Sequence, residues 1–262
     1  MGLEGKVIGI LGASSGIGEG AARAIATQNP RGLILAARRK DFLDNLAEEL
    51  RLEYGTSIMT ISTDATNPDE LKKFVDESVK AYGKIDAVIN SAGLIQEERH
   101  LEEMPGNEID LIINTNLGQV LKLGSYLIPH FLTQRSGIYL VISSQAGQKQ
   151  NAFPNEEIYN STKAGVDHAI RTLDKRFSRL RNESNQEIYT FSLAPGFVDT
   201  KEARKQFPNI PEEIWKRAPS PLKLATENII PYLTSPEKMS LKGEKISEDF
   251  HDPVHLIETV KF

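Results

Sequence analysis

Cysteine is absent from this chain of 262 residues. Its absence excludes disulfide bonds, thiolate catalysis and zinc sites built on cysteine, and it leaves the redox compartment undetermined. A strong excess of one charge is missing too, since 31 Lys and Arg residues stand against 36 Asp and Glu residues, a net charge of −5. A strong attraction to nucleic acid or to an anionic membrane is therefore not expected, and a small-molecule partner is favoured.

A long hydrophobic run is also missing from the N-terminus. The opening stretch MGLEGKVIGILGASSG has only a five-residue apolar run before a glycine, too short for a signal peptide or a membrane-spanning helix. Apolar residues nevertheless make up 39% of the chain and charged residues 26%, which favours a folded core over disorder. We therefore expect a soluble, cytoplasmic protein.

Short apolar runs alternate with longer amphipathic segments along the chain. In the segment 40–54, for example, Leu43, Leu46 and Leu50 fall at helical spacing. The alternation predicts a single α/β domain built on a parallel sheet. The expected strands are residues 6–11, 32–37, 57–63, 86–93, 137–147 and 188–196, with later helices near 101–132 and 159–181.

Residues 201–223 interrupt this alternation. The segment KEARKQFPNIPEEIWKRAPSPLK has four prolines and no strand pattern, and it lies between the end of one strand and the next helix. A long connection of this kind inside a compact domain is often functional. We expect it to form a substrate-covering insertion.

A glycine-rich turn, GASSGIG, follows the first expected strand and precedes a helix. Gly12, Gly16 and Gly18 would allow backbone amides at the helix N-terminus to meet a pyrophosphate, which predicts a phosphate site. The spacing is GxxxGxG and not GxGxxG, so a turn needed only for close strand–helix packing is the alternative.

Arg38 and Arg39 follow the second expected strand, twenty residues after Gly18. NAD enzymes usually carry an acidic residue there for the ribose 2′-hydroxyl, whereas a guanidinium suits the 2′-phosphate of NADP. The alternative is a pair of solvated charges at the start of the next helix.

Tyr159 and Lys163 stand four positions apart in IYNSTKAG. On a helix they share a face, so the ammonium would favour the phenolate and lower the pKa of Tyr159 from about 10 towards working pH. Such a tyrosine suits general acid or base catalysis. A chance pairing on an ordinary helix is the alternative for these two residues taken alone.

Six short motifs occur in order along the chain: GASSGIG, NSAG at 90–93, NLG at 116–118, ISS at 142–144, YNSTK at 159–163 and PGFVDT at 195–200. Together they resemble the short-chain dehydrogenase/reductase superfamily, in its YxxxK and GxxxGxG branch. The resemblance spans residues 5–246. It implies a Rossmann-like, doubly wound parallel sheet in one NAD(P)-binding domain, residues 1–262, and a homodimer or homotetramer.

The resemblance also implies an NADP(H)-dependent oxidoreductase that interconverts a ketone or aldehyde and an alcohol. Tyr159 matches the proton donor, Lys163 would lower its pKa and bind the nicotinamide ribose, and Ser144 would hydrogen-bond the substrate oxygen. Asn116 matches the asparagine whose backbone carbonyl holds a water that connects Lys163 to solvent. Asp64 would bind the adenine amine. The remaining coenzyme contacts that the resemblance implies are Gly12, Ser14, Ser15, Ile17, Gly18, Ala65, Ser91, Ala92, Gly93, Val198 and Thr200.

Departures from the family pattern leave two other functions open. Leu11 replaces the usual threonine and Ser91 the usual asparagine, so the polar contacts made there would be missing, and a catalytically silent NADP-binding protein is one alternative. The other is a 3-oxoacyl thioester reductase whose basic surface faces an acidic carrier, through Arg135, Lys175, Arg176 and Arg179. The C-terminal tail, 247–262, does not follow the family's VDGG pattern.

Ser144 and Tyr159 are separated by two residues more than is usual in the family. We expect the surplus to bulge around residues 148–157, QKQNAFPNEE, and to wall the substrate site, with Gln145 and Phe153 as contacts. No metal site is expected, because Pro253 interrupts any helix between His251 and His255.

Overall fold

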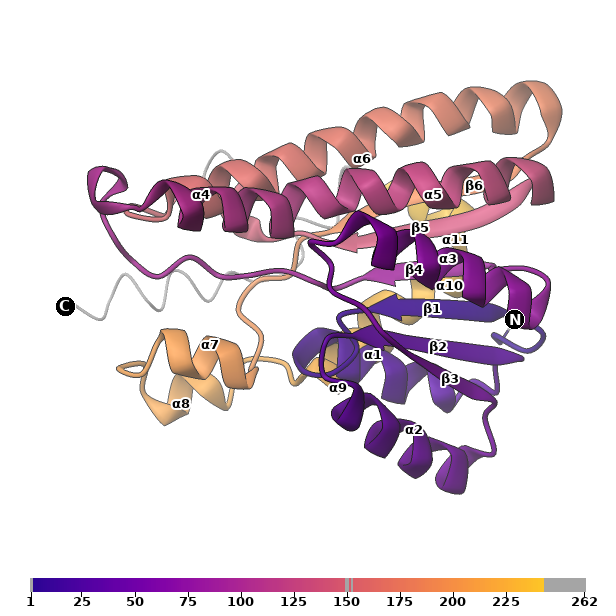
Figure 1. Cartoon of the computed structure of the whole chain (residues 1–262), viewed down its shortest axis with the longest axis horizontal. Helices are drawn as coiled ribbons and strands as arrows, with labels where there is room; N and C mark the ends of the chain where they lie inside the picture. The colour runs from indigo at the N-terminus through magenta and orange to yellow at the C-terminus, as the bar shows by residue number, and fades with distance from the viewer. Residues whose placement is uncertain (1, 149–150, 152, 243–262) are drawn as a thin grey trace.

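The computed structural model describes residues 2–148, 151 and 153–242 of the chain. Its centre is a sheet of six parallel strands in the order β3-β2-β1-β4-β5-β6 (Figure 1). The strands are β1 (Val7–Leu11), β2 (Gly32–Ala37), β3 (Ile58–Ser62), β4 (Ala87–Asn90), β5 (Ser136–Ile142) and β6 (Glu187–Leu193). The predicted parallel sheet is confirmed. The last three strands end earlier than expected, because residues 91–93, 143–147 and 194–196 leave the sheet as loops.

Chain order reverses beside β1, which pairs with β2 on one side and with β4 on the other. In doubly wound sheets a crevice forms at such a point, outside the carboxyl ends of the strands, because the following connections run to opposite faces. The Rossmann-like fold is therefore confirmed. It identifies Gly12 and Ser91, which directly follow β1 and β4, as residues of that crevice.

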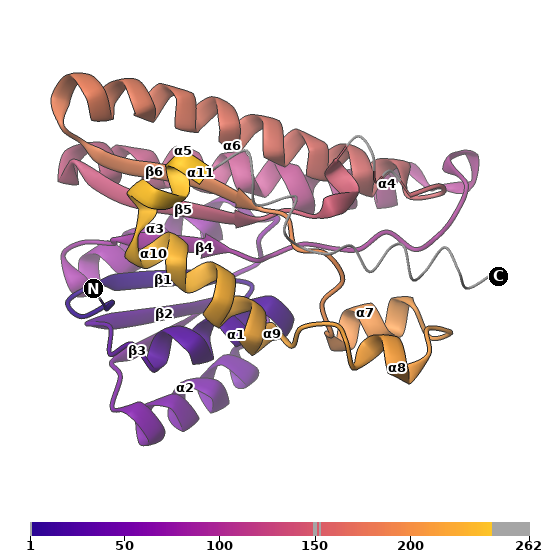
Figure 2. The ribbon, with the colours of Figure 1, turned by 180° about the vertical axis from the view of Figure 1, so that it is seen from behind.

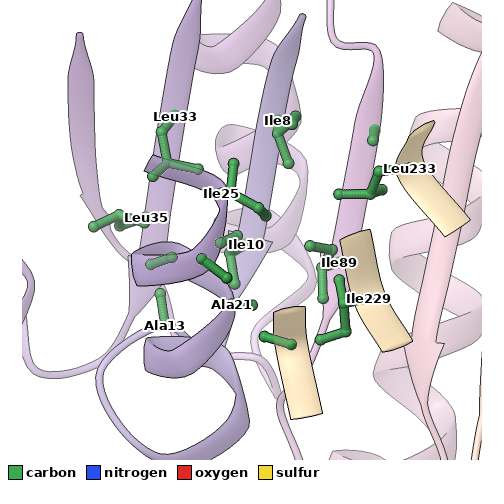
Figure 3. Close-up of a cluster of buried hydrophobic side chains, with 14 of the residues drawn as sticks. Ile8, Ile10, Ala13, Ala21, Ile25, Leu33, Leu35, Ile89, Ile229 and Leu233 are labelled. Carbon is green, nitrogen blue, oxygen red and sulfur yellow. The ribbon is translucent and has the colours of Figure 1, made fainter. Parts of the chain in front are cut away.

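One face of the sheet is covered by α1 (Gly16–Ala26), α2 (Lys40–Tyr54), η5 (Ala225–Ile229) and α10 (Ile230–Thr234). Figure 3 shows this cluster, in which Ile8 and Leu33 from the strands meet Ile25 of α1. Ile229 and Leu233 complete it from the C-terminal helices. Successive strand residues point to opposite faces, so Val7 and Leu11 belong to the other layer.

The opposite face is covered by α3 (Pro68–Tyr82), α5 (Gln119–Gln134) and α6 (Glu157–Ser184), and Figure 2 shows the two helical layers from behind. Phe74, Phe131 and Phe177 are completely buried between these helices and the sheet. The strands are therefore apolar on both faces, as parallel sheets with two helical layers require.

The helix expected near 101–132 is divided in the structure. A 3₁₀ turn, η1 (Leu101–Glu103), and α4 (Gly106–Ile113) precede a π-helical turn, η2 (Asn114–Gly118), which continues into α5. Such π turns are frequent at functional sites, and hydrophobic periodicity does not reveal them. The helix expected at 159–181 is α6, which begins two residues earlier and ends three residues later.

The insertion 201–223 forms short helices: α7 (Lys201–Gln206), α8 (Glu212–Trp215) and most of α9 (Pro221–Leu224). The Trp215 ring is 3% exposed and lies 4.4 Å from the ring of Phe197, which fixes α8 to the loop after β6. Helix α11 (Pro236–Lys242) follows α10. The expected tail, 247–262, with His251 and His255, lies outside the described residues. Within the described part, no helix is long and apolar enough to cross a membrane.

Helix α9 packs so closely on α1 that Gly20 has no room for a side chain. A Cβ at Gly20 would lie 2.4 Å from the carbonyl carbon of Pro221 and 2.5 Å from its oxygen. We expect Gly20→Ala to lower the free energy of unfolding by about 1–3 kcal/mol, because backbone must move to admit the methyl group. The control is Gly106→Ala, where nothing lies within 4 Å of a Cβ. Urea unfolding curves that coincide for Gly20→Ala and the parent protein would contradict this packing.

Candidate active site

A cavity of about 1490 Å³ opens at the carboxyl ends of the strands. The loops that follow all six strands line it, together with residues of the insertion 201–223. Because typical small-molecule sites measure roughly 300–1,000 Å³, this cavity has room for a dinucleotide and a second ligand. Among the described residues, no group of three His, Asp or Glu side chains is placed to hold a metal ion.

Nearly all the predicted site residues line this cavity, and two do not. Gly18 is buried, and a Cβ there would lie 2.2 Å from the Gly12 oxygen, so Gly18 permits close packing within the turn. Asn116 is buried behind Gly93. The predicted residues on the cavity wall are Gly12, Ser14, Ser15, Ile17, Arg38, Arg39, Asp64, Ala65, Ser91, Ala92, Gly93, Ser144, Gln145, Phe153, Tyr159, Lys163, Val198 and Thr200.

The glycine turn after β1 leaves donors for an anion at the start of α1. Gly12 and Gly16 have φ values of +85° and +56°, which glycine adopts without a steric penalty. Ser15, the N-cap residue, makes no side-chain capping hydrogen bond, so the first amides of α1 remain available to a phosphate. Thr200 faces this turn from the loop after β6, since a Cβ at Gly16 would lie 3.6 Å from its methyl carbon.

Arg39 is held beside the same turn. Its Nη2 donates to the Ser14 backbone oxygen at 3.3 Å and to the Ser14 hydroxyl at 3.1 Å, and its guanidinium carbon lies 4.3 Å from the centre of the Phe42 ring. Arg38 is its neighbour on the cavity wall. Two guanidinium groups therefore stand at one end of the anion site.

Asp64 is fixed at the mouth of the cavity by Thr66. Its Oδ1 accepts hydrogen bonds from the Thr66 N–H and hydroxyl, both at 2.8 Å. The bond from the Thr66 backbone is the main cause that holds the pKa of Asp64 below its usual value, and the charge of Arg38 adds to it. Asp64 is therefore an ionised acceptor next to Ala65, in the loop after β3.

Lys163 is buried at the start of α6. It is 5% exposed, and its Nζ donates to the Ile142 backbone oxygen at 3.2 Å. Burial lowers its pKa to about 8, while Asp167 and Glu202 oppose the shift. Because the pKa stays above neutrality, Lys163 carries its positive charge at pH 7.

The pKa of Tyr159 departs from the sequence-based expectation. Burial raises it to about 12; the hydrogen bond with Ser144 lowers it, and the carboxylates of Glu156 and Glu202 raise it. The expectation that Lys163 brings this pKa down towards neutrality is therefore wrong for the protein alone, because desolvation outweighs an ammonium 5.6 Å from the ring centre. Tyr159 is a neutral phenol at pH 7, which is the state a proton donor needs.

Ser144 lies beside Tyr159 despite the surplus residues between them. Its hydroxyl is a hydrogen-bond partner of the Tyr159 side chain, and it accepts from the Ala146 N–H at 3.1 Å. The short turn η3 (Gln145–Gly147) follows and packs against α6: a Cβ at Gly147 would lie 2.6 Å from the Lys163 carbonyl carbon. This contact returns the chain to α6, so the extra length does not separate the serine from the tyrosine.

The expected bulge at 148–157 lies partly outside the described residues, which omit 149, 150 and 152. Phe153 lines the cavity, and its backbone oxygen accepts from the Asn160 side chain at 2.7 Å. Gln145 also lines it, with its amide nitrogen 3.3 Å from the position of a Cβ at Gly196. Both residues predicted to contact substrate therefore line the same cavity as Tyr159, and their contact with a substrate stays a prediction.

Asn116 joins the catalytic helix to the loop after β4. It lies in the π turn η2, and its side chain accepts from the Leu94 N–H at 2.7 Å and donates to the Leu94 oxygen at 2.9 Å. A Cβ at Gly93 would lie 3.4 Å from Asn116 Oδ1 and 3.5 Å from Lys163 Nζ. The amide of Asn116 and the ammonium of Lys163 therefore meet at Gly93. The role expected of the Asn116 backbone carbonyl stays a prediction.

Packing accounts for the departures at Leu11 and Ser91. Leu11 is 1% exposed and belongs to the core, and its oxygen accepts from the Ser91 N–H at 2.9 Å. Next to it, the buried Asn90 side chain donates to Gln119 at 2.9 Å and to the Tyr139 hydroxyl at 3.0 Å. Apolar packing of Leu11 and this amide network therefore hold the ends of β1 and β4 together, at the positions where Leu11 and Ser91 replace the usual Thr and Asn.

The four basic residues considered for carrier binding lie away from the cavity. Arg135 directly precedes β5, at the amino edge of the sheet, and its guanidinium binds the Ser184 backbone oxygen at the far end of α6. Lys175 is sixteen positions after Tyr159 on α6, about 24 Å along the helix. The surface that Arg135, Lys175, Arg176 and Arg179 were expected to form therefore does not surround the site mouth.

Gln96 is a site residue that the sequence analysis missed. It is completely buried, and its Oε1 accepts from the N–H groups of Ile158 and Tyr159 at 3.1 and 3.0 Å. Its Nε2 donates to the Asn155 oxygen, and its own backbone oxygen accepts from Gln206 of α7. Gln96 thus caps α6 from another segment, since the N-cap residue makes no side-chain cap. In the sequence, only its position three residues after the NSAG motif could have indicated that Gln96 belongs to the site.

Loss of the Gln96 amide should displace Tyr159. We expect Gln96→Leu, which leaves two buried N–H groups without an acceptor, to lower kcat about 10-fold or more and to destabilise the fold by about 1–3 kcal/mol. Gln96→Glu keeps an acceptor oxygen and should retain more activity than Gln96→Leu. Coenzyme affinity, measured by fluorescence titration, should change little in either variant. Equal kcat values for parent and Gln96→Leu would show that the cap does not position Tyr159.

Comparisons of sequence agree on one family. A family model described as short chain dehydrogenase matches residues 6–211. An uncharacterised oxidoreductase of Listeria innocua is 35% identical over 204 residues, which cover 77% of each chain. A 3-oxoacyl-[acyl-carrier-protein] reductase of Thermotoga maritima is 30% identical over 256 residues, which cover 95% of this chain and 98% of the relative.

Solved structures give the same result. An alcohol dehydrogenase from the archaeon Thermococcus sibiricus, complexed with 5-hydroxy-NADP, is 30% identical with a TM-score of 0.75, and the match covers 89% of this chain and 92% of that one. A 7α-hydroxysteroid dehydrogenase complexed with NADH and a 7-oxo bile acid shares the fold, with a TM-score of 0.78 at 23% identity over 91% and 90% of the two chains. The chain therefore belongs to the short-chain dehydrogenase/reductase family of oxidoreductases.

Proposed function

We propose that the protein is an NADP(H)-dependent oxidoreductase that interconverts a ketone or aldehyde and an alcohol. The observation that carries the proposal is that Tyr159, Ser144 and Lys163 line one cavity with a helix N-terminus whose amides are free for a phosphate. The insertion 201–223 contributes residues to the same cavity, and we assign it the role of a cover over the substrate.

The residues present fit a nicotinamide dinucleotide. The turn at Gly12–Gly16 would hold the pyrophosphate, Arg38 and Arg39 the 2′-phosphate, and Asp64 the adenine amine, while Lys163 would bind the nicotinamide ribose. When bound, the coenzyme supplies or accepts the hydride.

Tyr159 supplies the proton in the reductive direction. Its pKa of about 12 keeps the phenol protonated at neutral pH, so it can donate to the carbonyl oxygen as negative charge develops there. The Ser144 hydroxyl, already a partner of the phenol, would donate to the same oxygen. Lys163, charged at pH 7, stabilises the phenolate that remains.

The catalytic role of Tyr159 is tested by Tyr159→Phe, which removes the proton and keeps the ring. We expect kcat for ketone reduction to fall about 100-fold or more, because general acid catalysis contributes about 10²–10⁴-fold. NADPH consumption across a ketone panel is the measurement, and NADPH affinity should be retained. Tyr54→Phe, the same change outside the cavity, is the control. Unchanged ketone reduction by Tyr159→Phe would refute the mechanism.

Coenzyme preference is tested at the two arginines. We expect Arg38→Asp and Arg39→Asp each to raise KM for NADPH about 10- to 100-fold, since each removes a charged donor from the 2′-phosphate. KM for NADH should change by less than about threefold, because NADH has no 2′-phosphate. Arg31→Asp makes the same charge change on an exposed residue outside the cavity and serves as the control. Equal effects on both coenzymes would refute the 2′-phosphate role.

A 3-oxoacyl thioester reductase is the second candidate function. One comparison favours it, the similarity to the Thermotoga maritima reductase along 95% of this chain. The basic residues on which carrier docking would depend lie at the other end of α6, so electrostatic support is missing. Rapid reduction of acyl thioesters that declines steeply with added salt would favour this candidate over reduction of small ketones. A catalytically silent binding protein has less support, because Ser144, Tyr159 and Lys163 are all present and close together.

A further inference from the structure

Glu156 is a buried carboxyl group on the wall of the active-site cavity. It is 7% exposed, it directly precedes α6, and it lies three positions before Tyr159. Among the described residues, no hydrogen bond or ion pair engages its side chain, and as the N-cap residue it makes no capping bond. Burying a carboxylate without a donor is costly to the folded protein. Because Glu156 lines the cavity, a donor on a ligand can reach it from there.

Among the residues that the structure describes, no positive charge is paired with Glu156. Burial, aided by the like charge of Glu98 in the loop after β4, raises its pKa to about 7. Tyr159, on its own helix, is a neutral phenol at that pH. Arg99, the cation nearest to Glu98 in sequence, is bound to Glu108 at 3.0 Å. Within the described part of the chain, the ionised form of Glu156 is therefore an acceptor without a paired donor.

The cavity around this acceptor is mainly apolar. Such a wall binds the body of a small molecule by the hydrophobic effect, and isolated polar groups then fix its orientation. Glu156, three positions before Tyr159 and on the same cavity wall, adds one such polar group. The apolar lining includes Leu94, Ile95, Leu111, Phe153, Phe197 and Phe207.

We propose that Glu156 binds a hydroxyl or ammonium group on the carbon next to the carbonyl that Tyr159 protonates. This inference rests on the proposed function and names its substrate class: α-hydroxy or α-amino ketones with an apolar body. In reduction, hydride adds to the carbonyl carbon and the Tyr159 proton goes to the oxygen, so the products are vicinal diols or amino alcohols. The donor group itself is unchanged, and no further reactant is needed.

The substrate requirement is tested with three phenyl ketones of similar size. Phenacyl alcohol and phenacylamine carry the donor, and propiophenone has a methyl group in its place. We expect kcat/KM with NADPH to be about 10- to 100-fold higher for the better of the two donor-bearing ketones than for propiophenone, as for a hydrogen bond to a charged group. Glu156→Gln should remove most of that advantage, because an amide oxygen is a weaker acceptor than a carboxylate, and propiophenone reduction gives the baseline rate for each variant. Glu157→Gln, an exposed carboxyl one position later, is the matched control.

Stability provides a second readout that separates binding from a structural role. The folded pKa of Glu156, about 7, lies above the usual value of 4.5 that the group has in the unfolded chain, so stability is highest below pH 4.5 and falls as pH rises through 7. Glu156→Gln removes this penalty, and we expect it to raise Tm at pH 8 and to have a smaller effect at pH 5. A structural carboxylate would give the opposite result, a lower Tm.

The outcomes distinguish this inference from the function on which it rests. Reduction of none of the three ketones, or of any in a wider panel, would overturn the proposed function itself. Equal kcat/KM for all three ketones, unaffected by Glu156→Gln, would overturn the role of Glu156 and leave the oxidoreductase intact. An advantage for phenacylamine alone selects the ammonium within the proposed class, and one for phenacyl alcohol alone selects the hydroxyl.

Discussion

The contact between the loops that follow β1 and β4 is the constraint on which the site depends. A Cβ at Gly12 would lie 2.8 Å from the Ala92 nitrogen, so the phosphate turn and the segment 90–96 touch through backbone. That segment then makes a series of contacts: Gly93 meets Lys163, Leu94 is held by Asn116, and Gln96 caps α6. The glycine turn and Tyr159 are thus located relative to one another by residues 90–96, the end of β4 and the loop that follows it.

Burial of polar groups gives this site its chemistry and costs the fold stability. The same desolvation that keeps the Tyr159 phenol protonated lowers the pKa of Lys163 and raises that of Glu156. Large pKa shifts caused by burial occur mainly at catalytic and binding sites. A protein selected for stability alone would have apolar residues in place of these buried titratable side chains. The apolar packing at Leu11 and the Asn90–Gln119 network provide rigidity around them.

The sequence predicted those features that depend on residues close together in the chain. Period-two and period-3.6 patterning predicted the strands and most helices, and the motif spacing placed Tyr159, Lys163 and Ser144 in one cavity. The division of 101–132 was not predictable, because a π turn at Asn116 leaves the hydrophobic pattern unchanged. The roles of Gln96 and Gly20 arise from partners 62 and more positions away, and no local signal reports such pairs. The pKa of Tyr159 depends on burial, which spacing does not measure.

The extra length between Ser144 and Tyr159 is best understood through the anchors at its two ends. On one side η3 packs on the Lys163 backbone, and on the other Gln96 holds the first N–H groups of α6, so contacts outside the connection hold both of its ends. Between these ends, the connection forms part of the cavity wall. Phe153 and Glu156 both lie on that wall. Under the proposed function, catalysis depends on the anchored ends, and substrate selection depends on the connection between them.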